Sequence, residues 1–198
     1  MRICGITQRR EEYPDRNEVR DALDRRLCDW VTEAGFYPLP IPNIWANRRE
    51  LMVGWLEKVD ISVIVLSGGG NVGDDQEREY TEKRILDYAG HKSLPLLGIC
   101  RGMQFMGTQS GGVLGSVSGH VRTRHRLTGE ITDEVNSFHE NALKSCPAGY
   151  RETSKSEDGV LEAMRHENLP WEGWMWHPER ETYFSSRHLE RFKKLANI

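Results

Sequence analysis

The stretch ISVIVLSGGG, residues 61–70, sets the expected fold of this chain. Its apolar part, Ile61–Leu66, is rich in β-branched side chains, which is typical of a parallel strand buried on both faces. The glycines that follow indicate a tight turn at the end of this strand. Further along, the sequence predicts a charged amphipathic helix at 77–89, a second buried strand at 94–99 and another helix at 101–110. This alternation predicts a three-layer α/β fold with a mostly parallel, doubly wound sheet.

The flanking sequence extends this pattern at both ends. Before residue 61 we expect a strand at Arg2–Ile6, a loop ending at Pro14, a helix over 15–34, a strand at Phe36–Ile41 and a short helix at Arg48–Glu57. The helix over 15–34 is predicted from apolar residues at helical spacing. Two prolines place the strand at 36–41 on an edge of the sheet. After Gly112 we expect short strands at 130–135, 150–154, 160–165 and 173–176 and a closing helix at 181–197.

Composition is that of an ordinary globular protein. With 198 residues the chain is long enough for one sizeable domain, so we expect residues 1–198 to form a single domain. A net charge of -3 does not indicate a broad nucleic-acid surface. The first ten residues lack the apolar core of a signal peptide, and no apolar run is long enough to cross a bilayer. The cysteines are scattered, without the close pairs of zinc sites or disulfide frameworks, so we expect a cytoplasmic protein.

A cysteine stands at the junction of the second buried strand and its helix. The segment LLGICRGMQ, residues 96–104, has the pattern G-x-C-x-G around Cys100, the thiol counterpart of the G-x-S-x-G nucleophile elbow. Side chains in place of Gly98 and Gly102 would collide in such a tight turn, and the helix N-terminus favours a thiolate. Most free cysteines are simply small buried residues, so this motif alone leaves both interpretations open.

A thiol nucleophile needs an imidazole to take and return a proton, and a third group to orient that imidazole. His177 and Glu179 supply both in WHPE, residues 176–179, at the end of a predicted strand. A single His-x-Glu triplet is more often a pair of surface residues. Its joint occurrence with the cysteine elbow and the glycine turn predicts a catalytic triad of Cys100, His177 and Glu179.

Taken in order, these motifs resemble those of class I glutamine amidotransferases and the related γ-glutamyl hydrolases. Residues 65–70 resemble the family's oxyanion strand, 98–104 its nucleophile elbow, 135–139 its substrate strand and 176–179 its His–Glu motif. The resemblance implies the flavodoxin-like fold of that family. It also implies an oxyanion hole of backbone N–H groups from Gly69 or Gly70 and from Arg101. The implied glutamyl-binding residues are Gln104, Asn136, Ser137, Phe138 and His139.

Two kinds of enzyme share this machinery. A hydrolase cleaves a γ-glutamyl amide through a γ-glutamyl thioester and releases glutamate, whereas the glutaminase component of an amidotransferase passes ammonia from glutamine to a synthetase partner. No synthetase domain fits within 198 residues. The segments 99–102, 136–139 and 157–163 resemble the branch that cleaves γ-glutamyl-γ-aminobutyrate and similar amides. One departure is that Glu140 and Asn141 stand where that branch commonly has a glutamine nearby.

The leaving group is the least defined part of the prediction. The helix start at 20–24 and the short chain resemble a bacterial subgroup that hydrolyses γ-glutamyl-CDP-amidate in capsule phosphoramidate synthesis. Arginines would suit its diphosphate, and the chain offers Arg9 and Arg10 after the first strand and Arg122 and Arg124 in the basic segment 120–126. The alternative for both basic clusters is a solvated loop.

A third possibility is a non-enzymatic relative with the same fold and an exposed cysteine, because a fold alone does not settle function. Such relatives usually lack the His-Pro-Glu motif. The sequence implies no cofactor, since no phosphate-loop or dinucleotide fingerprint is completed at residues 68–70. It also implies no metal, because His120 and His125 lie in a basic segment without acidic ligands nearby. We therefore expect a small-molecule γ-glutamyl substrate, and neither a nucleic acid nor a membrane as partner.

Overall fold

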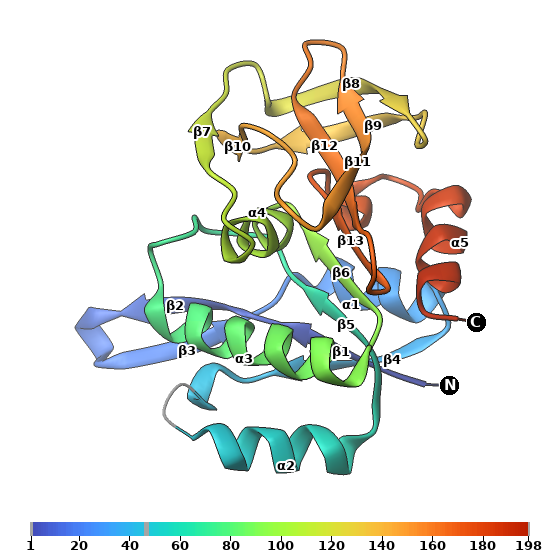
Figure 1. The fold of residues 1–198 in the computed structure, drawn as a ribbon. Helices are drawn as coiled ribbons and strands as arrows, with labels where there is room; N and C mark the ends of the chain where they lie inside the picture. The colour runs from blue at the N-terminus through green and yellow to red at the C-terminus, as the bar shows by residue number, and fades with distance from the viewer. Residues whose placement is uncertain (1, 46–47, 198) are drawn as a thin grey trace.

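The computed structural model describes residues 2–45 and 48–197, and Figure 1 shows the arrangement of their helices and strands. The helices are α1 (Arg25–Glu33), α2 (Arg49–Val59), α3 (Gln76–Lys92), α4 (Arg101–Gln109) and α5 (Ser186–Leu195). The strands are β1 (Arg2–Thr7), β2 (Arg9–Tyr13), β3 (Glu18–Ala22), β4 (Phe36–Ile41), β5 (Ile61–Leu66), β6 (Leu96–Ile99), β7 (Leu114–Ser116), β8 (Val121–Gly129), β9 (Glu134–Phe138), β10 (Asn141–Leu143), β11 (Tyr150–Ser156), β12 (Leu161–His166) and β13 (Trp171–Trp174). Short 3₁₀ turns lie at Pro14–Arg16, Asn43–Trp45 and Pro178–Arg180.

A nine-stranded sheet in the order β4-β1-β5-β6-β13-β12-β11-β8-β9 forms the centre of the molecule. From β4 to β13, neighbouring strands run parallel. From β13 to β9 they run antiparallel, and this half forms a cap over α4 at the top of Figure 1. The predicted α/β class with a mostly parallel, doubly wound core is confirmed, and the antiparallel cap accounts for the change of sequence pattern after Gly112.

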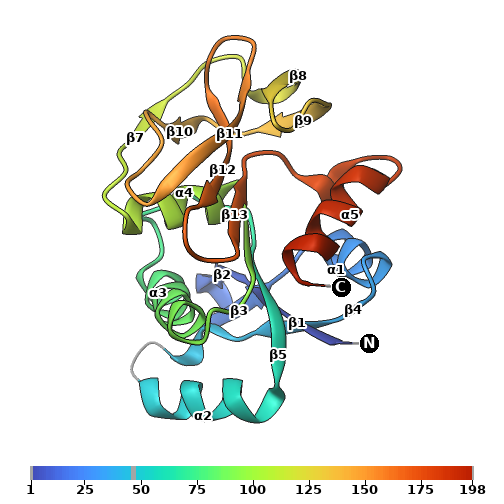
Figure 2. The same cartoon turned by 45° about the vertical axis from the view of Figure 1, so that its right-hand side comes forward.

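Helices cover both faces of the parallel strands and make three layers. Because side chains alternate along a strand, Val63 and Val65 of β5 point to one face, into a core with residues of α1 and α5. Ile64 and Leu66 point to the other face, into a core with residues of α2, α3 and α4. Figure 2 shows α3 and α4 on one side of the sheet and α1 and α5 on the other. Double burial explains why the β5 sequence is apolar without interruption.

Most of the predicted elements are present, with ends shifted by a few residues. The strand at Phe36–Ile41 is β4, and it lies at the edge of the sheet as its prolines predicted. The predicted helix over 15–34 is wrong in its first half, where β2 and β3 pair as an antiparallel hairpin. Asn17 adopts a left-handed conformation in the hairpin turn, and the Asp24 side chain accepts a hydrogen bond from the Arg26 N–H, so helix α1 starts only after Asp24.

Two segments of the cap also differ from the prediction. Residues 120–126 were expected to be a loop, but strand β8 occupies Val121–Gly129. The strand expected at 130–135 lies later, at Glu134–Phe138, and pairs with β8. Basic and polar side chains alternate along β8 with little burial, so its sequence carries no apolar pattern.

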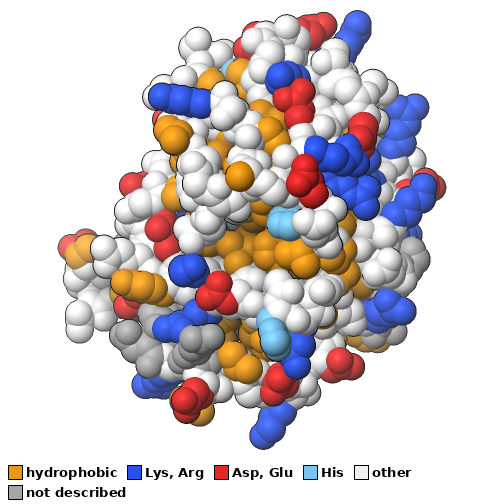
Figure 3. Space-filling model, viewed as in Figure 1, with side chains coloured by type: hydrophobic (Ala, Val, Ile, Leu, Met, Phe, Trp, Pro, Cys, Tyr) orange, Lys and Arg blue, Asp and Glu red, His pale blue; other side chains and the backbone are white. Residues whose placement is uncertain are grey.

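The outer surface is mixed in charge. On the face viewed in Figure 3, acidic and basic side chains are interspersed around the edge, and hydrophobic side chains form a band across the middle. Within residues 2–45 and 48–197, no helix has both the length and the apolar character needed to cross a membrane.

Candidate active site

Cys100 lies at the carboxyl end of β6, where β6 is flanked by β5 and β13. Leu66 is in register with Gly98, and Trp174 is in register with Ile99. The residues that follow these strands therefore emerge beside one another, at the edge of the sheet where α/β proteins bind ligands. The glycine turn after β5, Cys100 after β6 and His177 after β13 are brought together in this way.

Cys100 occupies a strained turn between β6 and α4. Its backbone has φ 49° and ψ −104°, a conformation that costs energy for a residue with a side chain. A Cβ atom on Gly98 would lie 2.7 Å from the Gly102 carbonyl carbon, and one on Gly102 would lie 2.2 Å from the Leu66 carbonyl oxygen. A side chain at either position would therefore collide with the backbone, as expected for such a tight turn. Cys100 is 6% exposed and precedes the first residue of α4, where the helix dipole favours an anion.

His177 is buried and held between an acid and the thiol. Its Nδ1 atom lies 2.7 Å from Oε1 of Glu179, which is also buried. Burial by itself lowers the pKa of the ring, but the charge of Glu179 and hydrogen bonds with Cys100 and Glu179 outweigh burial and raise the pKa of His177 to about 9. Near neutral pH the ring is therefore an imidazolium that can donate a proton.

Asn136 holds the His177 backbone in place from the cap. Its Oδ1 accepts from the His177 N–H at 3.0 Å, and its Nδ2 donates to the His177 carbonyl oxygen at 2.8 Å. On the opposite side, the ring packs so closely on Gly68 that a Cβ atom there would lie 2.6 Å from Cε1 of His177. The imidazole is thus fixed by strand β9 and by the glycine turn together.

A buried ion-pair network supports the glycine turn from below, and the sequence analysis did not identify it. Glu82 of α3 accepts from Arg78 at 2.9 Å, from the Thr7 hydroxyl at 3.0 Å and from Arg101. Arg78 donates to the carbonyl oxygens of Ser67 at 2.7 Å and Gly69 at 2.6 Å. The network therefore binds the turn through its carbonyl oxygens.

The side chain of Arg101 belongs to the same network. Besides Glu82 it reaches Glu79 at 3.2 Å and the carbonyl oxygen of Asn71 at 3.2 Å. Its backbone N–H is the first of helix α4 and has no partner within the helix. The predicted oxyanion role rests on this N–H, while the side chain joins α4 to α3 and to the end of the glycine turn.

A cavity of about 240 Å³ opens beside Cys100 and His177. Of the predicted glutamyl-binding residues, Gln104, Phe138 and His139 line it, together with Gly69 and Gly70. Gln104 donates to the carbonyl oxygen of Asn141 at 2.7 Å, so its amide oxygen remains available to a ligand.

The side chains of Asn136 and Ser137 do not appear among the described residues that line this cavity. Asn136 is bound to the His177 backbone, and the Ser137 hydroxyl donates to the carbonyl oxygen of His120 at 2.8 Å. Both are buried behind the wall. Arg180, which the sequence analysis did not single out, lines the cavity instead and stacks over Phe138 at 4.7 Å from the ring centroid.

The four arginines predicted at the rim have different surroundings. Arg9 and Arg10 line a second cavity of about 230 Å³, which shares Gly69, Gly70 and Asn71 with the first. Arg124 is bound by Glu134 at 2.8 Å and by Glu181 at 3.0 Å. Arg122 is exposed on β8, and neither it nor Arg124 is among the described residues lining the two cavities.

The expectation that His120 and His125 lack acidic neighbours is wrong in the folded chain. Asp158 lies 2.9 Å from Nε2 of His120, and Glu162 lies 3.3 Å from its Nδ1. Both acids come from the hairpin of β11 and β12, which is distant in sequence but packs against β8.

The chain matches the sequence profile of the family "Glutamine amidotransferase class-I" over residues 22–194, and it belongs to that family. Among its relatives, a protein named gamma-glutamyl-CDP-amidate hydrolase from Campylobacter jejuni is 27% identical over 189 residues, which cover 90% of each chain. One subunit of the glutamine-hydrolyzing GMP synthase of Archaeoglobus fulgidus is 28% identical over 149 residues, 70% of this chain and 76% of that protein.

Solved structures show the same fold at low sequence identity. A crystal structure of a putative GMP synthase subunit from Thermoplasma acidophilum superposes with a TM-score of 0.72 and 16% identity, covering 100% of this chain and 94% of the other. A glutamine amidotransferase from Thermotoga maritima superposes with a TM-score of 0.62 and 13% identity, covering 100% and 83%.

Proposed function

We propose that this protein is a cysteine-dependent hydrolase that cleaves a γ-glutamyl amide bond. The observation that carries the proposal is that Cys100 and His177, whose ring is bound by the buried Glu179, meet at a cavity that Gln104 and the glycine turn also line. A strained cysteine beside a carboxylate-bound imidazole is the arrangement that nucleophilic catalysis requires. It also argues against a non-enzymatic relative, for which an acid-bound histidine at the thiol has no purpose.

In the proposed reaction, the Cys100 thiolate attacks the γ-carbonyl carbon and forms a tetrahedral oxyanion. Backbone N–H groups of Gly69 or Gly70 and of Arg101 stabilise this oxyanion, and such donors typically contribute about 3 kcal/mol each. His177 gives its proton to the departing nitrogen, which leaves a γ-glutamyl thioester on Cys100. Water, deprotonated by His177, then attacks the thioester, releases glutamate and restores the thiolate–imidazolium pair.

We further propose γ-glutamyl-CDP-amidate as the substrate. The Campylobacter jejuni relative that carries this activity in its name matches nearly the whole chain. The two cavities support the assignment, because the one beside Cys100 and the one lined by Arg9 and Arg10 share residues 69–71 in their walls. A glutamyl group bound at Cys100 would thus direct its leaving group toward two arginines, which suit a diphosphate. Arg9, Arg10 and Arg124 are all paired with carboxylates. Arg124 is the weaker candidate for this contact because it does not line the cavity that Arg9 and Arg10 line.

The second candidate function is the glutaminase component of a two-protein amidotransferase. Glutamine-hydrolyzing subunits of GMP synthase from several organisms are relatives, which favours this possibility. In that case free glutamine would be the substrate and the ammonia would pass to a separate synthetase. The two candidates differ in what occupies the cavity of Arg9 and Arg10: a nucleotide leaving group in one, and no part of the substrate in the other.

The decisive experiment measures glutamate release from γ-glutamyl-CDP-amidate, γ-glutamyl-γ-aminobutyrate and glutamine. Cys100→Ser should reduce turnover of every substrate by at least about 1,000-fold, whereas Cys28→Ser, a control at a half-buried cysteine on α1, should leave it unchanged. Undiminished turnover in Cys100→Ser would show that Cys100 is not the nucleophile and would refute the proposal. A preference for glutamine over the nucleotide substrate would instead favour the glutaminase component.

A further inference from the structure

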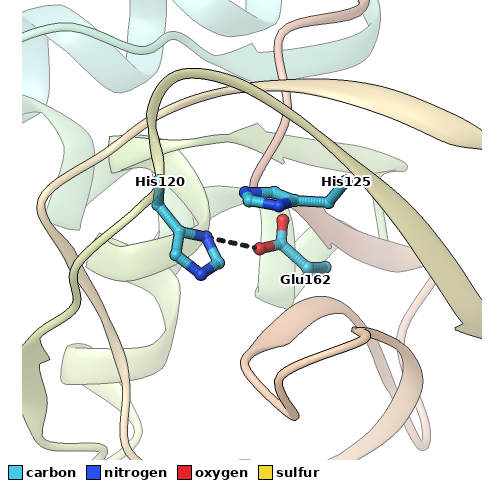
Figure 4. Close-up of side chains that lie close together, drawn as sticks. All are labelled: His120, His125 and Glu162. Carbon is cyan, nitrogen blue, oxygen red and sulfur yellow. Dashed lines mark ion pairs between the residues drawn. The ribbon is translucent and has the colours of Figure 1, made fainter.

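A second group of ionisable side chains lies in the cap, outside the catalytic centre. His120 immediately precedes β8, His125 lies within β8, His139 follows β9, and Glu162 lies on β12. Figure 4 shows His120, His125 and Glu162 converging, with the imidazole of His120 directed at the carboxylate. Nδ1 of His120 lies 3.3 Å from Oε1 of Glu162, and Nε2 of His139 lies 3.4 Å from the same oxygen.

The outward nitrogens of two of these rings are already engaged. Nε2 of His120 lies 2.9 Å from a carboxylate oxygen of Asp158, and Nδ1 of His139 lies 3.1 Å from the carbonyl oxygen of Asn141. Both oxygens are acceptors, so each of these nitrogens carries the ring proton. In the neutral rings the inward nitrogens therefore bear lone pairs, and both lone pairs face the carboxylate of Glu162.

The inward atoms are buried and lack hydrogen bonds. Glu162 is 0% exposed, and neither of its carboxylate oxygens has a hydrogen-bond partner among the described residues. Among the described residues, Nδ1 of His120, Nε2 of His125 and Nε2 of His139 also lack a hydrogen-bond partner. The contacts of His120 and His139 with Glu162 are close but are not aligned as hydrogen bonds. A buried carboxylate surrounded by lone pairs is costly unless a positive charge lies among them.

We propose that His120, His125 and Glu162, with His139 beside them, bind a divalent transition-metal ion such as zinc. Their ligand atoms lie within 4.8 Å of one another for the first three residues. Metal–ligand bonds of about 2.0–2.2 Å in a tetrahedral site place ligand atoms roughly 3.3 Å apart, which matches the two contacts at Glu162. Imidazole and carboxylate ligands together favour zinc over calcium or magnesium.

The surroundings resemble those of bound metals in a further respect. Histidine ligands of metals usually donate their other N–H to a carboxylate or a backbone carbonyl, as His120 does to Asp158 and His139 does to Asn141. The ligands come from three separate parts of the cap, so the ion would tie β8 and the turn after β9 to β12. His139 also lines the cavity of Cys100, and the metal would therefore hold that wall of the cavity in position.

The test uses the full-length chain carrying Cys100→Ser, so that the catalytic thiol cannot bind the metal. After treatment with a chelator, zinc binding is measured by calorimetry and Co²⁺ binding by its visible absorption, which reports tetrahedral coordination. We expect one ion per chain. His125→Ala should weaken zinc binding at least tenfold, and Asp158→Asn should weaken it by about 10- to 100-fold, as is typical for the partner of a histidine ligand. His91→Ala, an exposed control on α3, should change nothing.

Circular dichroism establishes that each variant is folded before binding is compared. Asp158 is largely exposed, so its substitution tests the site without disturbing a buried group. Equal zinc affinity in the parent and in His125→Ala, or no binding in either, would overturn the proposal. Loss of binding in His91→Ala would identify surface binding and would overturn it as well.

Discussion

Replacing Glu179 by Gln keeps the shape of the side chain and removes the charge that lies 2.7 Å from the His177 ring. The rise in the pKa of His177 from 6.5 to about 9 corresponds to about 3 kcal/mol in favour of the protonated ring. Glu179 supplies a large part of this free energy, and Cys100 supplies the remainder. Burial opposes protonation and is unchanged in Glu179→Gln, so the pKa of His177 should fall toward or below 6.5.

The consequence is a change in the pH dependence of glutamate release. In the native protein, kcat/KM should stay high in mildly alkaline solution and decline as pH rises through about 9, where His177 loses the proton needed by the departing nitrogen. In Glu179→Gln the decline should begin below neutral pH, and at a pH of about 8 the rate should be at least about tenfold lower. Steady-state measurement of glutamate release from about pH 6 to about pH 10 tests the predicted decline in both proteins.

Stability should follow the same ionisation. A histidine whose pKa is raised on folding stabilises the folded state fully below its unfolded pKa near 6.5, and this contribution is lost as pH rises to about 9. Glu157→Gln, at an exposed position in the cap, is the matched control and should change neither profile. An alkaline decline that remains near pH 9 in Glu179→Gln would refute the reasoning, because the proton on His177 would then not depend on Glu179.

Three more predictions concern the turn, its support and the leaving group. Gly102→Ala should destabilise the protein by about 1–3 kcal/mol and reduce kcat about 100-fold, because its Cβ meets the Leu66 carbonyl. The control Gly54→Ala in α2 has open space and should stabilise the protein by about 0.5–1 kcal/mol. Denaturant unfolding measures both changes in stability, and steady-state kinetics measures the change in kcat. Glu82→Gln should cost about 3–5 kcal/mol in unfolding free energy, since it leaves two buried arginines without their shared anion. Arg9→Ala should raise KM for the nucleotide substrate at least tenfold with little effect on glutamine, and equal effects on both substrates would contradict the proposed path of the leaving group.

The sequence predicted the parallel half of the fold well, because each of its strands has a physical signature of its own. Double burial makes β5 and β6 continuously apolar, and the prolines of β4 are typical of an edge strand. The hairpin of β2 and β3 has no such signature. Its residues are partly exposed on both faces, and Val19 of β3 happens to continue the helical spacing of the apolar residues that lie in α1. Strand β8 was missed for the same reason.

The residues of the candidate site differ in the same way in how far the sequence predicted them. Cys100 and His177 stand in short motifs whose spacing is imposed by local geometry, so they were identified from the sequence. Glu82 and Arg78 act through carbonyl groups and partners that only the tertiary fold brings together. The i,i+4 spacing of Arg78 and Glu82 on one helix was a visible signal, but it is equally typical of a solvent-exposed pair, and only burial distinguishes the two cases.

Register explains why Cys100 and His177, the proposed nucleophile and its base, need no flexible segment to meet. Because β6 pairs with β5 on one side and β13 on the other, Cys100 must emerge between the glycine turn and the chain leading to His177. The same strands are packed on both faces, so a displacement of the catalytic residues would require moving the core itself. In the proposed function, the walls that meet the substrate come instead from the hairpin after β1 and from the antiparallel cap, where Asn136 also holds the His177 backbone. In the proposed function the hairpin contributes to substrate choice and not to bond cleavage, so substitutions in the hairpin should alter specificity while leaving the cleavage step intact.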